Sequence, residues 1–175
     1  MISAQATARS LPADAAMAPA GGPTVLTTRF GDVAVDPANA VEMPRGLLGF
    51  AEHRAFAIAA LPDPRFGQFR LLQCLTDPEV SFLVLPVDPD AGILAAEDCT
   101  AACQALSIAR EDVVVLVIVT IRRIAAESRV SINLRAPVFV DVRTRRGWQF
   151  VFSNGRYPIR QELPLVGVQV AGGGG

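Results

Sequence analysis

The sequence predicts an all-β or β-rich α+β fold, a small twisted antiparallel β-barrel or sandwich that carries one short helix. Short runs of Val, Leu, Ile and Phe recur at close spacing along the chain. Turn-forming clusters such as Pro62-Asp63-Pro64 and Asp77-Pro78 separate these runs, and a single segment has helical character. Short strands at this spacing favour a barrel or sandwich over alternating strand–helix units.

The first predicted strands form a hairpin. Thr24–Phe30 and Val33–Val35 are β-prone, and Gly31–Asp32 between them predicts a tight turn. The next predicted strands are apolar runs bounded by Pro, Asp and Gly residues: Ala55–Ala60, Phe69–Leu75 and Ser81–Leu85.

The longest predicted strand is Asp112–Ile121, which consists almost entirely of β-branched residues and Leu. This composition suits a strand that is buried on both faces. Three further strands are predicted after it: Val130–Leu134, Val138–Arg143 and Trp148–Phe152. Thr144–Gly147 is predicted to link the last two of these strands.

One segment, Ala95–Leu106, predicts a helix because it lacks Gly and Pro and carries Glu97 and Asp98 in its first turn. Helical spacing places Cys99 and Cys103 on one face, four residues apart. Two thiols cannot complete a metal site alone, so we expect these cysteines to pack as small apolar side chains in the core.

Length and composition bound the domain organisation. The chain has 175 residues, 51% of them hydrophobic, which suits one domain. We expect a disordered Ala/Pro-rich extension over residues 1–23, a single domain over 24–163 and a flexible tail over 164–175. The longest apolar run, Val113–Val119, is far short of the roughly 20 residues that span a bilayer. We expect a cytoplasmic protein that is a monomer and does not bind membranes.

Several kinds of catalysis lack the residues they require. All sixteen basic residues are arginine, which excludes phosphate-binding and Schiff-base lysines. His53 is the single histidine, so one chain cannot form a catalytic triad or a multi-histidine metal site. Cys74 and His53 are the further candidates for a metal site with the helical cysteines, but no spacing supports them. We expect no enzyme activity, metal or cofactor, and a solvent-facing loop position for His53.

Charge is unevenly distributed along the chain. Between Asp32 and Asp112 there are thirteen acidic residues and five arginines, and between Arg122 and Arg160 there are nine arginines and two acidic residues. A fold that separates these segments would be electrically lopsided and would favour a charged partner. A fold that interleaves them would cancel the asymmetry, and the sequence leaves both alternatives open.

Arginines near aromatic residues raise the alternative of RNA binding. Arg143, Arg145 and Arg146 precede Trp148, and Tyr157 follows, which together resembles a phosphate-contacting surface with a stacking aromatic. The net charge of −1 and the pI of about 5.8 argue against direct nucleic-acid binding. Trp148 is therefore expected in the core.

Two stretches, Met43–Phe50 and Asn133–Pro137, have more specific sequences than ordinary turns between strands. Met43–Phe50 contains Pro44, turns on Gly46 and Gly49 around an apolar pair, and ends at Phe50. Asn133-Leu134-Arg135-Ala136-Pro137 is predicted to interrupt two strong strands. Pro137 cannot donate to a strand ladder, and the Asn133 side chain is expected to bond backbone groups across the resulting kink. Both stretches are predicted to be important for the fold or for partner binding.

Taken in order, these stretches resemble the FliW family of flagellar assembly factors. The resemblance covers about residues 25–163 and departs from the family pattern at Met43, where Phe is usual, and at Asp141, where Asn is common. The matching segments are Val41–Phe50, Asp77-Pro78, Phe82–Pro86, the short acidic helix, the apolar strand Val113–Ile121, Asn133–Pro137 and Thr144–Gln149.

The resemblance implies a protein that binds flagellin and, alternatively, the RNA-binding translational regulator CsrA, whose repression of flagellin synthesis it relieves. It implies no reaction and no cofactor. A basic RNA-binding regulator suits an acidic surface, so we expect it to dock on the acidic half of the chain, at Glu42, Glu79 and Asp88. A small-ligand or flavin-binding barrel and an RNA-binding β protein remain the competing classes.

Overall fold

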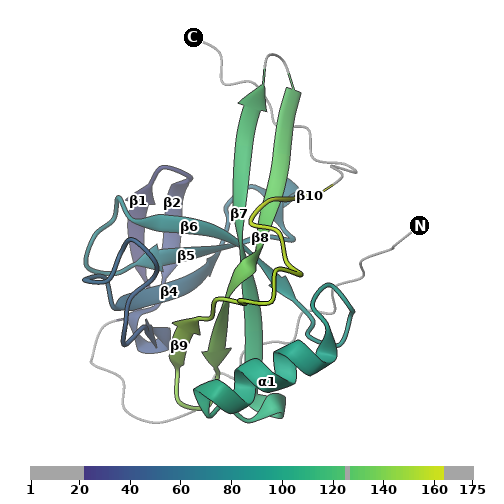
Figure 1. Ribbon diagram of the computed structural model, residues 1–175. Coiled ribbons are helices and arrows are strands. Elements are labelled where there is room, and N and C mark those ends of the chain that lie inside the picture. Colours follow the sequence, from purple (N-terminus) through teal and green to yellow (C-terminus); the bar gives the residue numbers. More distant parts are fainter. Residues whose placement is uncertain (1–21, 125–126, 164–175) are drawn as a thin grey trace.

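The computed structural model describes residues 22–124 and 127–163, and strands dominate it (Figure 1). The predicted flexible tail (164–175) and all of the predicted disordered extension except Gly22 and Pro23 lie outside the described residues. The predicted fold class is confirmed, since the strands form a largely antiparallel, barrel-like sheet with one α-helix.

A two-stranded hairpin precedes the main sheet. It consists of β1 (Thr24–Thr28) and β2 (Gly31–Val35). The predicted turn position was wrong: the turn falls on Arg29 and Phe30, and Gly31 already pairs with Thr28. The physical reason is that the positive φ of +96° is needed at Gly31, the residue that follows the turn.

The main sheet closes on itself. In sheet order its strands are β10 (Gln161–Leu163), β8 (Glu127–Asp141), β7 (Val113–Ile124), β6 (Ser81–Val87), β5 (Arg70–Cys74), β4 (Ala55–Ala60), β3 (Val41–Glu42) and β9 (Arg146–Gln149). Antiparallel pairing of β9 with β8 and parallel pairing of Glu42 with Arg146 complete the ring from β3 to β9. Short 3₁₀ turns connect two pairs of strands, at Pro37–Asn39 and Pro64–Phe66, and a third, Arg110–Asp112, precedes β7.

The β7–β8 pair is much longer than the barrel wall and projects beyond it as an arm (Figure 1). The predicted break between two strands at Asn133–Pro137 was wrong, because these residues lie within the single strand β8. Leu116 pairs with Val138 and Ile118 pairs with Asn133, so Val117 alone lies opposite four residues of β8. The motif is therefore an irregularity at which the barrel part of β8 ends and the arm begins.

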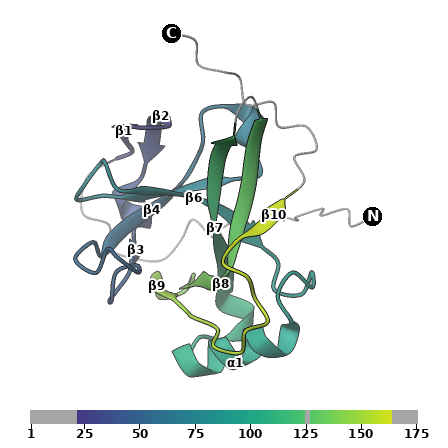
Figure 2. The same cartoon turned by 45° about the horizontal axis from the view of Figure 1, so that its top comes forward.

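Apolar side chains fill both sides of the central strands. Leu72 faces the barrel interior and its neighbour Leu71 faces the β1–β2 hairpin. Leu116 likewise points into the interior, whereas Val115 and Val117 pack in the cluster that includes helix α1 (Ala96–Leu106). This confirms the prediction of a strand buried on both faces. Figure 2 shows α1 at the end of the barrel opposite the arm.

Candidate functional site

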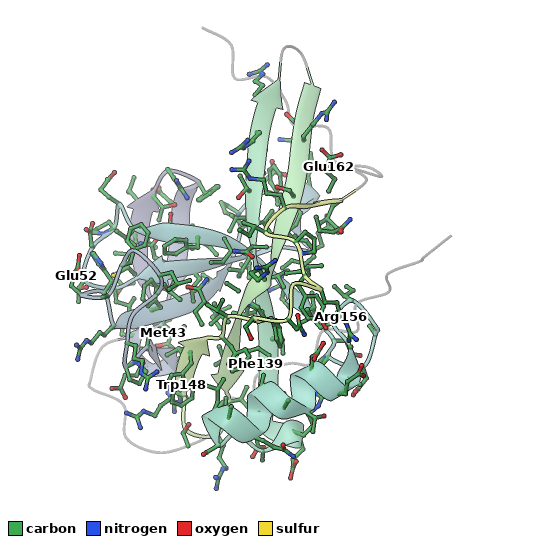
Figure 3. All side chains as sticks on the ribbon, viewed as in Figure 1. Met43, Glu52, Phe139, Trp148, Arg156 and Glu162 are labelled. Carbon is green, nitrogen blue, oxygen red and sulfur yellow. The ribbon has the colours of Figure 1, made fainter. Side chains whose placement is uncertain are left out.

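Three of the sequence motifs meet where β9 closes the barrel. Val41–Phe50 enters this region through β3, and Thr144–Gln149 contributes β9 itself. Asn133–Pro137 lies next to β9, because Val138 of β8 pairs with Gln149. We call this region the motif junction. Figure 3 shows Met43 and Trp148 on this side of the molecule.

The Met43–Phe50 motif ends in a tight turn over residues 47–50. Phe50 donates its N–H to the carbonyl of Leu47 at 2.8 Å, and Leu47 donates back at 3.4 Å. Gly49 supplies the positive φ of +83° that this turn needs. Leu47 is buried, whereas 63% of Leu48 is exposed. The turn therefore holds one apolar side chain in the core and presents the next to solvent.

Two glycines allow close approaches at the junction, Gly46 to the backbone of Phe50 and Gly147 to the side chain of Met43. A Cβ added at Gly46 would lie 2.3 Å from the Phe50 carbonyl oxygen, and Gly46 also has a positive φ of +63°. A Cβ at Gly147 would lie 2.6 Å from the sulfur of Met43. Met43 is fully buried, and its side chain packs against β9 at Gly147. The Gly46 position admits no other residue without strain.

The Gln149 side chain connects all three motifs. Its Oε1 accepts the N–H of Leu48 at 2.9 Å, and its Nε2 donates to the carbonyl of Ala136 at 3.0 Å. One amide therefore joins the Leu47–Phe50 turn to β8 from a position on β9. Gln149 was not among the predicted site residues. The one feature of the sequence that pointed to it was its position at the end of the Thr144–Gln149 segment.

Asn133 bonds the backbone of its own motif, as predicted. Its Oδ1 accepts the N–H groups of Arg135 at 3.0 Å and Ala136 at 3.1 Å. Pro137 donates nothing but its carbonyl accepts the N–H of Phe150 at 2.9 Å. Polar groups freed by the irregularity in β8 are thus satisfied locally, which keeps the Ala136 carbonyl in place for Gln149.

A small apolar surface results from these contacts. Residues after β9 continue in an extended form, since Phe150 and Phe152 donate to carbonyls two residues apart on β8. Both aromatic rings pack in the core, so the alternate side chains of Gln149 and Val151 face outward. Val151 is 50% exposed. Leu48, Gln149 and Val151 together form what we call the junction surface.

His53 supports the turn from the other side, and its predicted solvent-facing position was wrong. Its side chain is only 17% exposed, and its Nε2 lies 3.4 Å from a carboxylate oxygen of Asp77. The imidazole also meets the Phe50 ring edge-on, with centroids 5.9 Å apart. The polar sequence neighbours of His53 concealed this burial, because Phe50 folds back over it. His53 links the turn to the loop between β5 and β6.

The cysteines of α1 are placed as predicted, on one buried face. Burial raises the pKa of the Cys99 thiol to about 11 and also raises that of Cys103. Both therefore remain neutral thiols at physiological pH. Among the described residues, no group of three or more His, Cys, Asp or Glu side chains is arranged to hold a metal ion.

The fold cancels part of the charge asymmetry of the sequence. Arginines of the basic segment Arg122–Arg160 pair with acids of the acidic segment Asp32–Asp112, so the two segments interleave. The distances are 3.1 Å for Arg146–Glu42, 3.6 Å for Arg143–Asp112, 3.0 Å for Arg156–Asp98 and 3.2 Å for Arg156–Glu97. Tyr157 is buried and donates its hydroxyl to Asp98 at 2.5 Å, so it is not free to stack on a base.

The three acids of the predicted docking side do not form one patch. Glu42 is engaged by Arg146 on β9. Glu79 and Asp88 are exposed but lie beyond opposite ends of β6, a seven-residue strand about 23 Å long. Their role in binding a basic partner stays a prediction.

In the part of the chain that the structure describes, no helix is long and apolar enough to cross a membrane.

Comparisons with known proteins give one consistent result. The family model described as FliW protein matches residues 24–163. The flagellar assembly factor FliW of Syntrophotalea carbinolica is 32% identical over 154 residues, which cover 79% of this chain and 96% of the relative. That of Geobacter sulfurreducens is 29% identical, with 76% and 81% covered. A crystal structure of the flagellar assembly factor FliW shares the fold at a TM-score of 0.60 and 24% identity, covering 79% and 96% of the two chains.

Proposed function

The chain belongs to the FliW family, and from this membership we propose that it is a flagellar assembly factor that acts by binding proteins and catalyses no reaction. Its two partners are flagellin and a CsrA-type RNA-binding regulator of translation. Binding the regulator relieves its repression of flagellin synthesis. Binding flagellin withdraws the factor from the regulator and restores repression.

This coupling needs no chemistry beyond mass action. Two partners that compete for one protein deplete one another, so the free regulator rises as flagellin accumulates. The observation that supports this proposal most directly is the convergence of three family motifs on one exposed turn, joined by Gln149. A turn whose backbone is fixed at several points loses little conformational freedom when a partner binds.

The junction surface is our proposed contact site for flagellin. Leu48 and Val151 are two of only four large apolar side chains that are exposed among the described residues. Leu48 donates its N–H to the Gln149 amide, which fixes the turn, and Val151 follows Gln149 two residues later, on the same outward side of the extended segment. A packed apolar anchor next to a rigid backbone is the type of surface that contributes most to protein–protein affinity.

Calorimetric titration of the purified full chain with monomeric flagellin and with the CsrA-type regulator tests the function. We expect both to bind, and we expect added flagellin to release the regulator from a preformed complex. The absence of binding to either protein would overturn the proposal. If the regulator stayed bound in the presence of saturating flagellin, the proposed competition would be wrong, although the proposed binding of the regulator would stand.

The contact site is tested by Leu48→Asp, which places a charge on the exposed turn without disturbing the buried Leu47. Val25→Asp is the matched control, because Val25 is also 63% exposed but lies on β1, in the separate hairpin. We expect Leu48→Asp to weaken flagellin binding by roughly tenfold or more, as for an anchor residue. Equal affinities for the two variants would show that flagellin binds elsewhere.

A further inference from the structure

The arm formed by β7 and β8 has one edge without a strand beside it. β6 pairs with β7 from Val115 to Ile118 and then diverges toward the barrel. Over residues 119–124 of β7, no strand of the described chain pairs on the side away from β8. Figures 1 and 2 both show the arm rising clear of β6. Backbone N–H and C=O groups along such an edge are available for pairing.

The opposite edge of the same arm is occupied along Val130–Ile132 of β8. Strand β10 is a three-residue segment, Gln161-Glu162-Leu163, that pairs antiparallel with β8. Leu163 packs against the core cluster, and Glu162 lies 3.4 Å from Arg129 on the exposed face. The arm therefore binds a short extended segment by adding a strand and placing a carboxylate beside an arginine.

The open edge offers the same chemistry. Arg122 and Arg123 are both exposed on β7, and alternation of side chains places one on each face of the arm. Neither arginine has a hydrogen bond or ion pair with any other described residue. Arg122 pairs across the strands with Arg129, so two positive charges lie on one face. An incoming carboxylate would be attracted from either face.

We propose that the open edge of β7 binds an extended acidic segment of a partner protein as an added strand. The backbone groups of residues 119–124 supply the hydrogen bonds, and Arg122 and Arg123 select for carboxylates. Ile121, half-buried on the face opposite Arg122, favours an aliphatic residue next to the acid, as in Glu162-Leu163 on the other edge. This mode of recognition is strand addition, in which main-chain bonds give affinity and alternate side chains give specificity.

Charge argues against a second copy of this chain as the occupant. Antiparallel pairing of two β7 edges centred on residues 119–124 would bring four exposed arginines together. Like charges on paired strands are destabilising, and charged residues on an edge are a common protection against pairing between identical chains. The proposal rests on the arm alone and does not depend on the function proposed above.

The probe is a fluorescent eight-residue peptide of alternating Glu and Val, measured by anisotropy with the full chain at two salt concentrations. We expect binding that weakens with salt, and no comparable binding of the counterpart in which Lys replaces Glu. The double variant Arg122→Gln/Arg123→Gln is expected to lose affinity roughly three- to tenfold. Arg160→Gln is the matched control, since Arg160 is exposed and lies on the β10 side of the arm.

Two N-methylated peptides test whether a strand is added. Each is methylated at every second residue, in one or the other register, so that only one of them loses the N–H groups that face β7. We expect one peptide to lose at least roughly tenfold in affinity and the other to keep it. Equal affinities of the two peptides, or equal binding of the Lys peptide, would overturn the proposal. So would a wild-type dimer, seen by sedimentation, that the Glu–Val peptide converts to monomer.

Discussion

The motif junction and the arm are built on the same strand, β8, but use it in opposite ways. At the junction, β8 is enclosed by β7 and β9, and its Ala136 carbonyl accepts the Gln149 amide. Along the arm, the same strand is flanked by β7 and the short β10, and the outer edge of β7 remains open. The irregularity at Asn133–Pro137 marks the change from one environment to the other.

Because of this difference, we expect substitutions in the two regions to affect stability and binding differently. At the junction, Gln149 lies on β9, the strand that closes the barrel, and its side chain also fixes the exposed turn. Along the arm, Arg122 and Arg123 are exposed and have no ion pair with a described residue, and Arg122 lies opposite Arg129 on the neighbouring strand. Changes at the junction should therefore lower stability and binding together, whereas changes of Arg122 and Arg123 on the arm should weaken binding without lowering stability.

The largest expected effect is that of Gly46→Ala. A Cβ at this position meets the Phe50 carbonyl oxygen at 2.3 Å, and the φ of +63° is unfavourable for any residue with a side chain. We expect the free energy of unfolding to fall by roughly 3–4 kcal/mol, measured by urea denaturation.

Gly49→Ala is the matched control for that substitution. Gly49 also has a positive φ, of +83°, but nothing lies within 4 Å of an added Cβ. Only the conformational cost applies, roughly 1–2 kcal/mol. Equal losses for the two variants would mean that close approach of the backbone does not hold the junction together.

An intermediate effect is expected for Gln149→Ala, which removes both hydrogen bonds of the bridging amide. Since water can replace the partner of the exposed Leu48 N–H, we expect a loss of about 1–2 kcal/mol. Hydrogen exchange at the Leu48 amide should accelerate at the same time. Gln161→Ala, which removes an exposed amide on β10, should leave stability within about 0.5 kcal/mol. If Gln149→Ala changed neither stability nor exchange, the junction would not depend on its bridge.

Much of the fold could be predicted because local composition and tertiary environment agree. Strand β4 and helix α1 match their predicted ranges to within a residue, and β7 has the apolar composition of a strand buried on both faces. The continuity of β8 through Asn133–Pro137 could not be predicted in this way. Pro137 and Asn133 are signals of interruption, but the side chain of Asn133 satisfies enough backbone groups for the strand to continue.

The candidate site was predicted less completely, because its key contacts are long-range. Gly46 and Gly49 are visible in sequence as turn residues, but the partner of the turn, Gln149, lies about a hundred residues away. His53 looked solvated because its sequence neighbours are polar, and only the fold brings Phe50 and Asp77 against it. Local signals indicate where the backbone must turn, but they do not indicate which side chain will fix the turn.

The smallest expected effect belongs to the arm and is a gain. Arg122→Glu converts a like-charge pair with Arg129 into an opposite-charge pair across the two strands. We expect stability to rise by about 0.2–1 kcal/mol at low salt, with the gain fading as salt is added. Arg123→Glu is the control, because its cross-strand partner is Ser128 and no such gain is expected. Both variants should nevertheless bind the acidic peptide more weakly. A loss of stability in Arg122→Glu as large as that in Gln149→Ala would show that the arm, like the junction, couples its surface to the fold.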